Sequence, residues 1–235
     1  MTTDGAVDLL VFGPHPDDLE IGLGGTIALH AARGMRVGLC DLTSGEMGSN
    51  GDPEQRRAES EAARQVLGAA WRENLCWPDR RIGKDRQHLD QAVSFIRRHR
   101  PRVVAAPYWR DRHPDHEAAS ELLTEAVFNA GLRRYVAEGE AWKPEWICYY
   151  FINDASEPSF LIDVSAHYDT KRAALECHAS QFTRQADAAA TRLNTPIFQQ
   201  LIESRDAQFG ARAGVAWAEG VVVREPIVRV SLMKS

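Results

Sequence analysis

The chain has 235 residues, of which 44% are hydrophobic and 26% are charged, and its formal net charge is −5. These values predict one soluble globular domain that spans residues 1–235, and the negative charge argues against a nucleic-acid-binding surface. The chain has no apolar run of about 18 residues, so we expect no membrane span, and residues 1–5 lack the features of a signal peptide.

Predicted strands and helices alternate through the first half of the chain. A strand is expected at 8–12, a helix at 21–33 that ends at Gly34, and a second strand at 35–42. Asp52 and Pro53 are typical of a helix N-cap and first helical position, so they predict a helix that ends at Leu67. The Gly-rich polar segment 43–51 precedes this helix and is a candidate substrate lid.

The second half of the chain continues the alternation. A third strand is expected to contain 75–77, and it is followed by a helix at 86–99, a strand at 103–107 and a helix at 115–128. Short strands are expected at 146–152 and 159–164, helices near 166–180 and 195–209, and a last strand near 221–223. This order predicts an α/β fold, with a mostly parallel sheet that has helices on both faces.

The four cysteines are consistent with a reducing compartment. They are Cys40, Cys76, Cys148 and Cys177, and no two of them form a CxxC pair. We interpret each as a small hydrophobic core residue and expect a cytoplasmic protein.

Polar side chains gather where the first strand ends. Residues 13–20 (GPHPDDLE) connect this strand to the first helix and contain His15, Asp17 and Asp18. In an open α/β sheet, ligands bind at the carboxyl ends of the strands. Two adjacent carboxylates repel each other when both are ionised, and a metal cation is a common partner that relieves this repulsion. An alternative interpretation is a turn in which Asp18 only caps the helix.

A second polar cluster follows the strand at 103–107. Residues 108–116 (YWRDRHPDH) place His113 three residues before His116, just as His15 stands three residues before Asp18. Two histidines and one carboxylate, with open positions for water, are typical of catalytic zinc or ferrous iron. The alternative is that His113 and Asp115 form a capping pair at the start of the helix.

The glycines at 22–25 permit another interpretation, a dinucleotide-binding loop. However, their spacing does not match GxGxxG, and the His-Pro-Asp-Asp turn occupies the place of the pyrophosphate. We therefore expect no nicotinamide or flavin cofactor, and we expect these glycines to permit close packing of helix and strand.

The two clusters resemble the signature motifs of the LmbE-like, PIG-L superfamily of metal-dependent N-deacetylases. The resemblance covers about residues 7 to 223 and is closest to the bacillithiol-biosynthesis deacetylases. It extends to 41–51 (DLTSGEMGSNG), 72–75 (RENL), 78–80 (PDR), 106–109 (APYW), 149–153 (YYFIN) and 218–220 (AEG). The resemblance implies a Rossmann-like α/β fold and a small-molecule substrate, N-acetylglucosaminyl-malate, from which the acetyl group is removed. It also implies a homo-oligomer, since relatives are often trimers or hexamers.

Carried over by motif, the resemblance also implies site residues. The implied ligands of Zn²⁺, or alternatively Fe²⁺, are His15, Asp18 and His116. The implied catalytic residues are Asp17 as general base, His113 in its protonated form as electrophile or acid, and Asp115 as the partner that tunes His113. Asp17 is expected to accept a proton from a metal-activated water that attacks the acetyl carbonyl.

Substrate contacts are less well defined by the motifs. Arg56 matches the family arginine that contacts substrate, although it could also be a solvated helix charge. Glu46 is a candidate for binding sugar hydroxyls or for stabilising its own loop. Arg112 is a candidate for binding the anionic end of the substrate, or a surface group in a salt bridge. Residues 183–193 do not align with the family, so their role stays open.

Other functions remain as alternatives. Within the superfamily these are a thiol-conjugate amidase and a broader N-acetylglucosaminide deacetylase. A binding module would carry a structural metal with four protein ligands, whereas the sequence provides three. A metal-dependent phosphoesterase usually needs a second metal set, which the sequence does not provide clearly.

Overall fold

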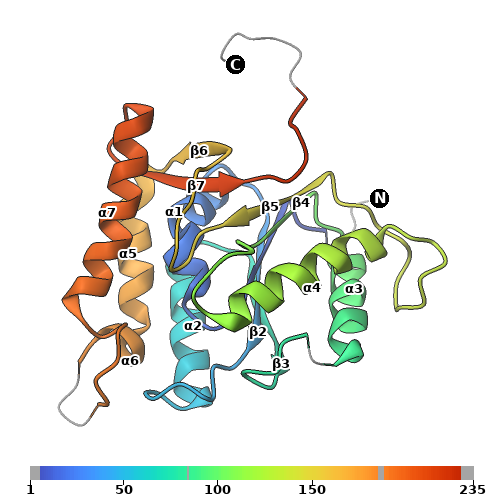
Figure 1. Ribbon diagram of the computed structural model, residues 1–235, viewed down its shortest axis with the longest axis horizontal. Coiled ribbons are helices and arrows are strands. Elements are labelled where there is room, and N and C mark those ends of the chain that lie inside the picture. Colours follow the sequence, from blue (N-terminus) through green and yellow to red (C-terminus); the bar gives the residue numbers. More distant parts are fainter. Residues whose placement is uncertain (1–5, 84, 185–187, 229–235) are drawn as a thin grey trace.

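In the computed structural model, seven strands form one sheet (Figure 1). In chain order the strands are β1 (Leu9–Gly13), β2 (Val37–Thr43), β3 (Trp71–Trp77), β4 (Val103–Pro107), β5 (Trp146–Tyr150), β6 (Phe160–Asp163) and β7 (Ala218–Val222). Their order across the sheet is β3-β2-β1-β4-β5-β7-β6. The first five run parallel, and β7 pairs antiparallel with β5 and β6. The expected mostly parallel sheet is confirmed.

The structure describes residues 6–83, 85–184 and 188–228. Residues 1–5, on which the signal-peptide expectation depends, and part of the unaligned segment 183–193 lie outside these ranges. No helix in the described ranges is both long enough and apolar enough to cross a membrane.

Helices cover both faces of the sheet, as predicted. They are α1 (Asp18–Ala32), α2 (Pro53–Leu67), α3 (Arg86–His99), α4 (Pro114–Ala130), α5 (Tyr168–Cys177), α6 (Ala179–Phe182) and α7 (Pro196–Ala213), with a 3-10 turn at Ser165–His167. Side chains of α3 and α4 form one core with Leu10 and Phe12 of β1. Side chains of α1, α2 and α5 form the other core with Leu9 and Val11. Strands buried on both faces explain the continuous apolar runs in the sequence.

The structure gives fuller bounds for two of the expected elements. β3 contains the expected 75–77 and begins at Trp71, and its residues 72–74 are polar. A polar side chain of this strand finds its partner on the neighbouring strand, since Arg72 donates two hydrogen bonds to Asp41 of β2. The helix expected at 166–180 is divided into the 3-10 turn, α5 and α6, and His178 separates the last two.

The first helix, which carries Asp18, is broken at Leu23, where φ is −134° and ψ is 18°. Glu219 of β7 accepts the N–H groups of Gly25 at 2.9 Å and Thr26 at 2.7 Å, so it caps the second half of the helix. On the other side of the break, Arg205 donates to the carbonyl of Ile21 at 2.7 Å. The break therefore has charged partners on both sides, and these partners hold the first half of α1 in place.

Candidate active site

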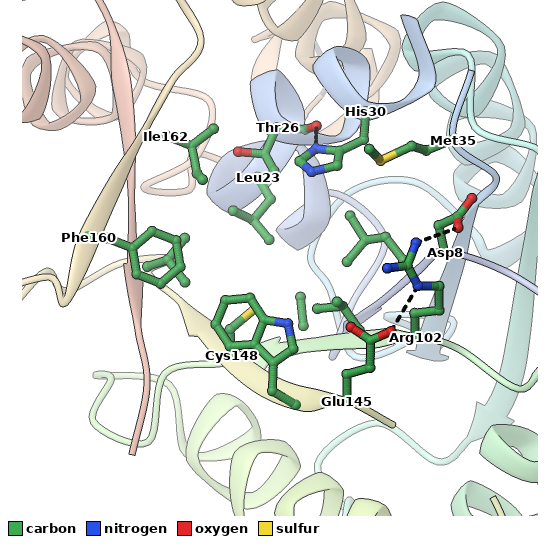
Figure 2. Close-up of a pocket in the computed structure, with 15 residues that line it drawn as sticks. Asp8, Leu23, Thr26, His30, Met35, Arg102, Glu145, Cys148, Phe160 and Ile162 are labelled. Carbon is green, nitrogen blue, oxygen red and sulfur yellow. Dashed lines mark hydrogen bonds and ion pairs between the residues drawn. The ribbon is translucent and has the colours of Figure 1, made fainter. Parts of the chain in front are cut away.

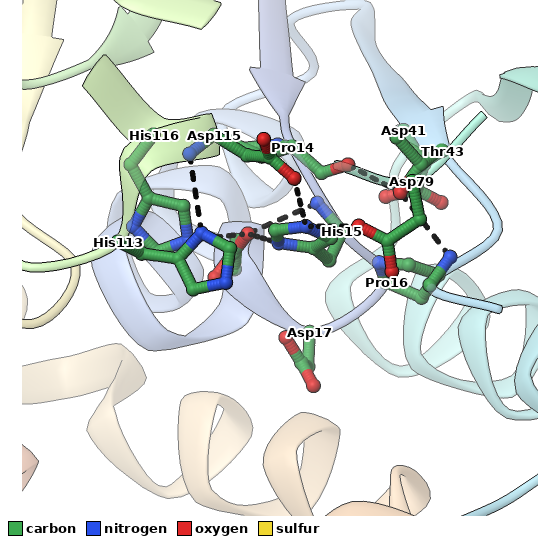
Figure 3. A network of polar contacts seen from close by, with 12 residues as sticks. Pro14, His15, Pro16, Asp17, Asp41, Thr43, Asp79, His113, Asp115 and His116 are labelled. Carbon is green, nitrogen blue, oxygen red and sulfur yellow. Dashed lines mark hydrogen bonds and ion pairs between the residues drawn. The ribbon is translucent and has the colours of Figure 1, made fainter. Parts of the chain in front are cut away.

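Loops that follow β1, β3 and β4 meet at the carboxyl edge of the sheet. The parallel register of β1 with β2 and β4 aligns the ends of these strands. As a result His15, Asp79 and the pair His113 and His116, which are far apart in the sequence, lie in contact (Figure 3). This edge is where the polar motifs were expected to meet.

The structure brings His15, Asp18 and His116 together around one carboxylate oxygen. Oδ2 of Asp18 lies 3.1 Å from Nδ1 of His15 and 3.3 Å from Nε2 of His116. A ring nitrogen of His113 lies within 4.8 Å of one nitrogen each of His15 and His116, so a third imidazole borders the same space. All of these groups are buried except His113 and His15, which are half-buried. The three nitrogen and oxygen donors thus face a common point.

Two aspartates that the sequence argument did not select anchor the outer nitrogens of these histidines. Oδ1 of Asp79 lies 3.2 Å from Nε2 of His15. Oδ1 of Asp111 lies 3.0 Å from Nδ1 of His116. A carboxylate behind a ligating imidazole is a common arrangement in metal sites, because it fixes the ring and its tautomer. The sequence feature that could have identified these two aspartates is their position, because each follows a strand that ends at this edge of the sheet.

The carboxylates around the imidazoles make the pocket favour positive charge. Burial opposes protonation of His116, but Asp18 and Asp111 outweigh it and raise its pKa to about 9. Burial also opposes protonation of His15, yet hydrogen bonds to carboxylates, that of Asp115 foremost, raise its pKa well above the ordinary value. A site that holds protons this strongly also suits a divalent cation, which would displace them on binding. The residues present therefore fit a metal ion.

Asp17 is adjacent to Asp18, but its side chain lies elsewhere. Its backbone is left-handed, with φ 113° and ψ −28°, and this uncommon conformation turns the two carboxylates apart. Figure 3 shows Asp17 below the imidazoles in this view, with no contact drawn to them. Burial raises the pKa of Asp17 to about 6, although the charge of Arg56 opposes the shift. A buried carboxylate with a pKa near neutrality is suited to general base catalysis.

Arg56 is buried at the start of α2, and its guanidinium donates hydrogen bonds to two backbone carbonyls and one carboxylate. Its Nη1 donates to the carbonyl of Gly45 at 2.8 Å. Its Nη2 donates to the carbonyl of Pro16 at 2.7 Å and to Oδ2 of Asp17 at 3.3 Å. The guanidinium therefore joins the Gly-rich loop to the turn that carries Asp17, and its expected substrate contact stays a prediction.

His113 is the N-cap of α4, and its ring lies beside the two other imidazoles. Its ring centroid is 4.8 Å from that of His15 and 4.7 Å from that of His116. Its Nδ1 accepts the N–H of Asp115 at 3.3 Å, so in the neutral ring Nε2 carries the hydrogen. Burial and the neighbouring imidazoles lower its pKa to about 4. The structure therefore favours a neutral N–H donor rather than the protonated His113 that was expected.

The carboxylate of Asp115 contacts Arg80 and His15 rather than His113, its expected partner. It accepts from Nη1 of Arg80 at 2.9 Å and from the N–H of Arg80 at 3.0 Å. Its Oδ2 also lies 3.4 Å from Nε2 of His15. Asp115 thus contacts His113 through its backbone, whereas its carboxylate acts on His15.

The two other candidate substrate-binding residues, Glu46 and Arg112, are exposed. Oε1 of Glu46 accepts the N–H of Asp79 at 2.7 Å, so Glu46 joins its own loop to the loop after β3. Arg112 lines an open pocket of about 380 Å³ together with Tyr108 and Arg110. Substrate binding by Glu46 and Arg112 stays a prediction.

A second cavity, of about 290 Å³, lies at the opposite end of the sheet (Figure 2). Its walls are mostly apolar and include Leu23, Phe160 and Ile162. At its rim, Arg102 is paired with Asp8 at 3.5 Å and with Glu145 at 3.0 Å. The charged groups at this rim are thus paired with one another, whereas the clustered imidazoles and carboxylates described above lie at the carboxyl edge.

Comparisons with known proteins match the chain to one family model and to several related proteins. Residues 10–127, about half of the chain, match the family model described as PIG-L, GlcNAc-PI de-N-acetylase. The chain is 29% identical to the diacetylchitobiose deacetylase of Thermococcus kodakarensis, over 91% of this chain and 81% of that protein. It is 30% identical to a 4-oxalmesaconate hydratase of Pseudomonas putida, over 73% of each. The crystal structure of the conserved protein TT1542 from Thermus thermophilus is 40% identical, with a TM-score of 0.89 over 97% of this chain and all of that chain.

Proposed function

Because the chain belongs to the PIG-L family of GlcNAc-PI de-N-acetylases, we propose that it is a metal-dependent hydrolase that removes the acetyl group from N-acetylglucosaminyl-malate in bacillithiol biosynthesis. The observation that carries the proposal is the convergence of His15, Asp18 and His116 with Asp17 on the adjoining turn. The malate conjugate is supported by motifs along the chain that resemble the bacillithiol subgroup.

The metal would be held by His15 through Nδ1, Asp18 through Oδ2 and His116 through Nε2. We propose Zn²⁺, and Fe²⁺ suits the same donor set. When bound, the cation supplies positive charge that polarises the acetyl carbonyl and makes a water molecule more acidic. The backing carboxylates of Asp79 and Asp111 hold the two imidazoles in the required orientation.

The remaining chemistry belongs to the side chains of this chain. Asp17 accepts the proton of the attacking water, and Arg56 keeps its carboxylate in place. His113 presents its Nε2–H to the oxygen that becomes negative in the tetrahedral intermediate. The proton on Asp17 then passes to the amine that leaves, which restores the carboxylate. Asp115 orients His113 through its backbone N–H.

The anionic malate end requires cationic partners outside the metal site. Arg112, and Arg110 beside it, are exposed in the pocket that follows β4. An arginine fork suits bidentate binding of a carboxylate. Glu46 borders the site from the Gly-rich loop and is proposed to contact sugar hydroxyls with its free oxygen. We further propose a cytoplasmic homo-oligomer, and the four free cysteines are consistent with that compartment.

The test is release of free amine from N-acetylglucosaminyl-malate and from N-acetylglucosamine, with metal-loaded protein and with protein treated with a chelator. We expect metal-dependent turnover of the malate conjugate and much slower turnover of the plain sugar. Equal turnover of both sugars would retain the deacetylase and reject malate as the preferred aglycone.

Hydration of 4-oxalmesaconate is the second candidate function. It is favoured by the 30% identity to a hydratase with that name. Hydration would be detected by loss of the substrate's conjugated ultraviolet absorbance. Hydration without amine release from either sugar would overturn the proposed function.

A further inference from the structure

We propose that Asp79 is a positioning residue that couples the Gly-rich loop 45–51 to the metal ligand His15. The inference rests on the proposed function only in taking His15 as a ligand. Asp79 lies in the loop after β3, 64 residues from His15 in the sequence, and it is 9% exposed. Figure 3 shows its carboxylate beside the His15 ring.

The two ring nitrogens of His15 face different carboxylates. Nδ1 faces Oδ2 of Asp18 at 3.1 Å, and Nε2 faces Oδ1 of Asp79 at 3.2 Å. A carboxylate accepts hydrogen bonds and does not donate them, so Asp79 keeps the hydrogen on Nε2. The lone pair of Nδ1 is then available on the side of Asp18 and His116.

Asp79 is better placed for this task than Asp115, the other carboxylate near Nε2. Asp115 is farther away, at 3.4 Å, and already accepts two hydrogen bonds from Arg80. Among the described residues, the only ion-pair partner of Asp79 is His15. Asp79 is therefore the nearer of the two carboxylates that face Nε2 of His15, and the one without an arginine partner among the described residues.

Asp79 also contacts the Gly-rich loop 45–51. Oδ2 of Asp79 accepts the N–H of Met47 at 3.1 Å, and the N–H of Asp79 donates to Oε1 of Glu46 at 2.7 Å. One carboxylate thus contacts the loop with one oxygen and His15 with the other. A shift of the loop would move Asp79 and reorient the imidazole, while a metal bound to His15 would hold the loop.

The Asp79 carboxylate has one oxygen at the Nε2 of His15 and the other at the N–H of Met47, and two acceptor oxygens explain why an aspartate suits this position. Asparagine has the same shape but only one acceptor atom, so it can satisfy either His15 or Met47. If its amide group faced His15, Nε2 would have to accept, and the hydrogen would move to Nδ1, where it would block metal binding.

Asp79 could also be a direct ligand of a second metal ion rather than a residue that positions His15. Atoms of His15, Asp79 and Asp115 also lie within 4.8 Å of one another, as donors to a second cation would. The guanidinium of Arg80 at Asp115 already supplies positive charge there. We therefore expect one metal per chain, with Asp79 outside its ligand set.

The experiment titrates metal-free wild type, Asp79→Asn and the control Asp169→Asn with Co²⁺, followed by visible absorption. Asp169 is 98% exposed in its side chain and lies on α5. We expect one equivalent in all three proteins, and an affinity weaker by about 10- to 100-fold in Asp79→Asn only. Hydrogen exchange supplies a second measurement. Metal should slow amide exchange in 45–51 of the wild type and the control, and not in Asp79→Asn.

Unchanged affinity in Asp79→Asn would overturn the proposal, as would two equivalents in the wild type with one lost in the variant. If Asp79→Asn does not fold, Glu46→Ala removes the loop's support of Asp79 without touching His15. Weaker Co²⁺ binding in Glu46→Ala is then expected, and wild-type affinity would reject the coupling. Metal affinity is measured without substrate, so a protein that binds Co²⁺ as expected but hydrolyses no sugar would refute only the proposed function.

Discussion

Asp17 and Asp18 are neighbours in sequence that the fold assigns to different partners. The left-handed backbone of Asp17 sends its carboxylate to Arg56, while Asp18 faces His15 and His116. One residue can therefore bind a metal while the next moves a proton. This division of work makes the two carboxylates separable by mutation.

Asp17→Asn tests the proton-transfer role. The amide keeps the size of the side chain but cannot accept the proton of water, so we expect kcat to fall by about 10²- to 10⁴-fold. Metal content should stay at the wild-type level, because Asp17 does not contact the imidazoles. Kinetic assays paired with metal analysis of the same sample check this. A variant that loses its metal would instead place Asp17 among the ligands.

Arg56→Lys tests what the buried guanidinium binds. Lysine cannot reach Gly45, Pro16 and Asp17 together, and hydrogen bonds to charged groups contribute about 1.5–3 kcal/mol each. We expect kcat/KM to fall about tenfold or more, by a similar factor for the malate conjugate and for plain N-acetylglucosamine. A loss confined to the malate conjugate would show that Arg56 contacts the malate carboxylate instead.

At the scale of elements, the break in α1 connects the active site to the C-terminal part of the chain. Glu219 caps the second half of α1 and also pairs with Lys171 at 2.7 Å. Lys171 is fully buried and pairs with Asp206 of α7 at 2.7 Å as well. The helix that carries Asp18 thus depends on β7, α5 and α7 for its position.

Glu219→Gln tests this dependence. Glutamine supplies one acceptor where Gly25, Thr26 and Lys171 all donate, and removal of one partner from a buried ion pair destabilises by about 3 kcal/mol or more. We expect a loss of that size in the free energy of unfolding, measured with urea on metal-free protein. The matched control is Glu203→Gln, whose exposed pair with Arg172 should contribute at most about 1 kcal/mol. Equal losses in the two variants would contradict the capping role.

At the scale of the whole molecule, a buried charge network beneath the site joins α1 to the sheet. Arg72 donates to Asp41 at 2.7 and 2.8 Å and to Glu20 at 2.6 Å. Nε2 of His178 lies 3.3 Å from the other oxygen of Glu20. Burial disfavours ionised Glu20, but Arg72 and His178 outweigh it and hold its pKa at about 2.

The network predicts a loss of stability in acid. Because the pKa of Glu20 is lower in the folded state than its ordinary 4.5, its contribution is present above pH 4.5 and is lost as the pH falls toward 2. The contribution of this one group is at most about 3 kcal/mol. Urea unfolding at several pH values should show Glu20→Gln to be less stable at pH 7 and less sensitive to acid. Parallel pH profiles for the variant and the wild type would contradict the assignment.

Local sequence patterns predicted the alternation of strands and helices and the edge of the sheet where the polar motifs meet, and the family resemblance implied His15, Asp18 and His116 as metal ligands. The alternation and the edge follow from local spacing, turn residues and the rule that parallel strands end together. Local patterns did not reveal that β3 includes the polar residues 72–74 or that α1 is broken at Leu23, because the partners of both come from other strands and helices. The partners of Arg56 and the carboxylates of Asp79 and Asp111 behind the imidazoles became visible in the folded chain. Contacts such as that between His15 and Asp79, 64 residues apart, leave no local pattern in a sequence.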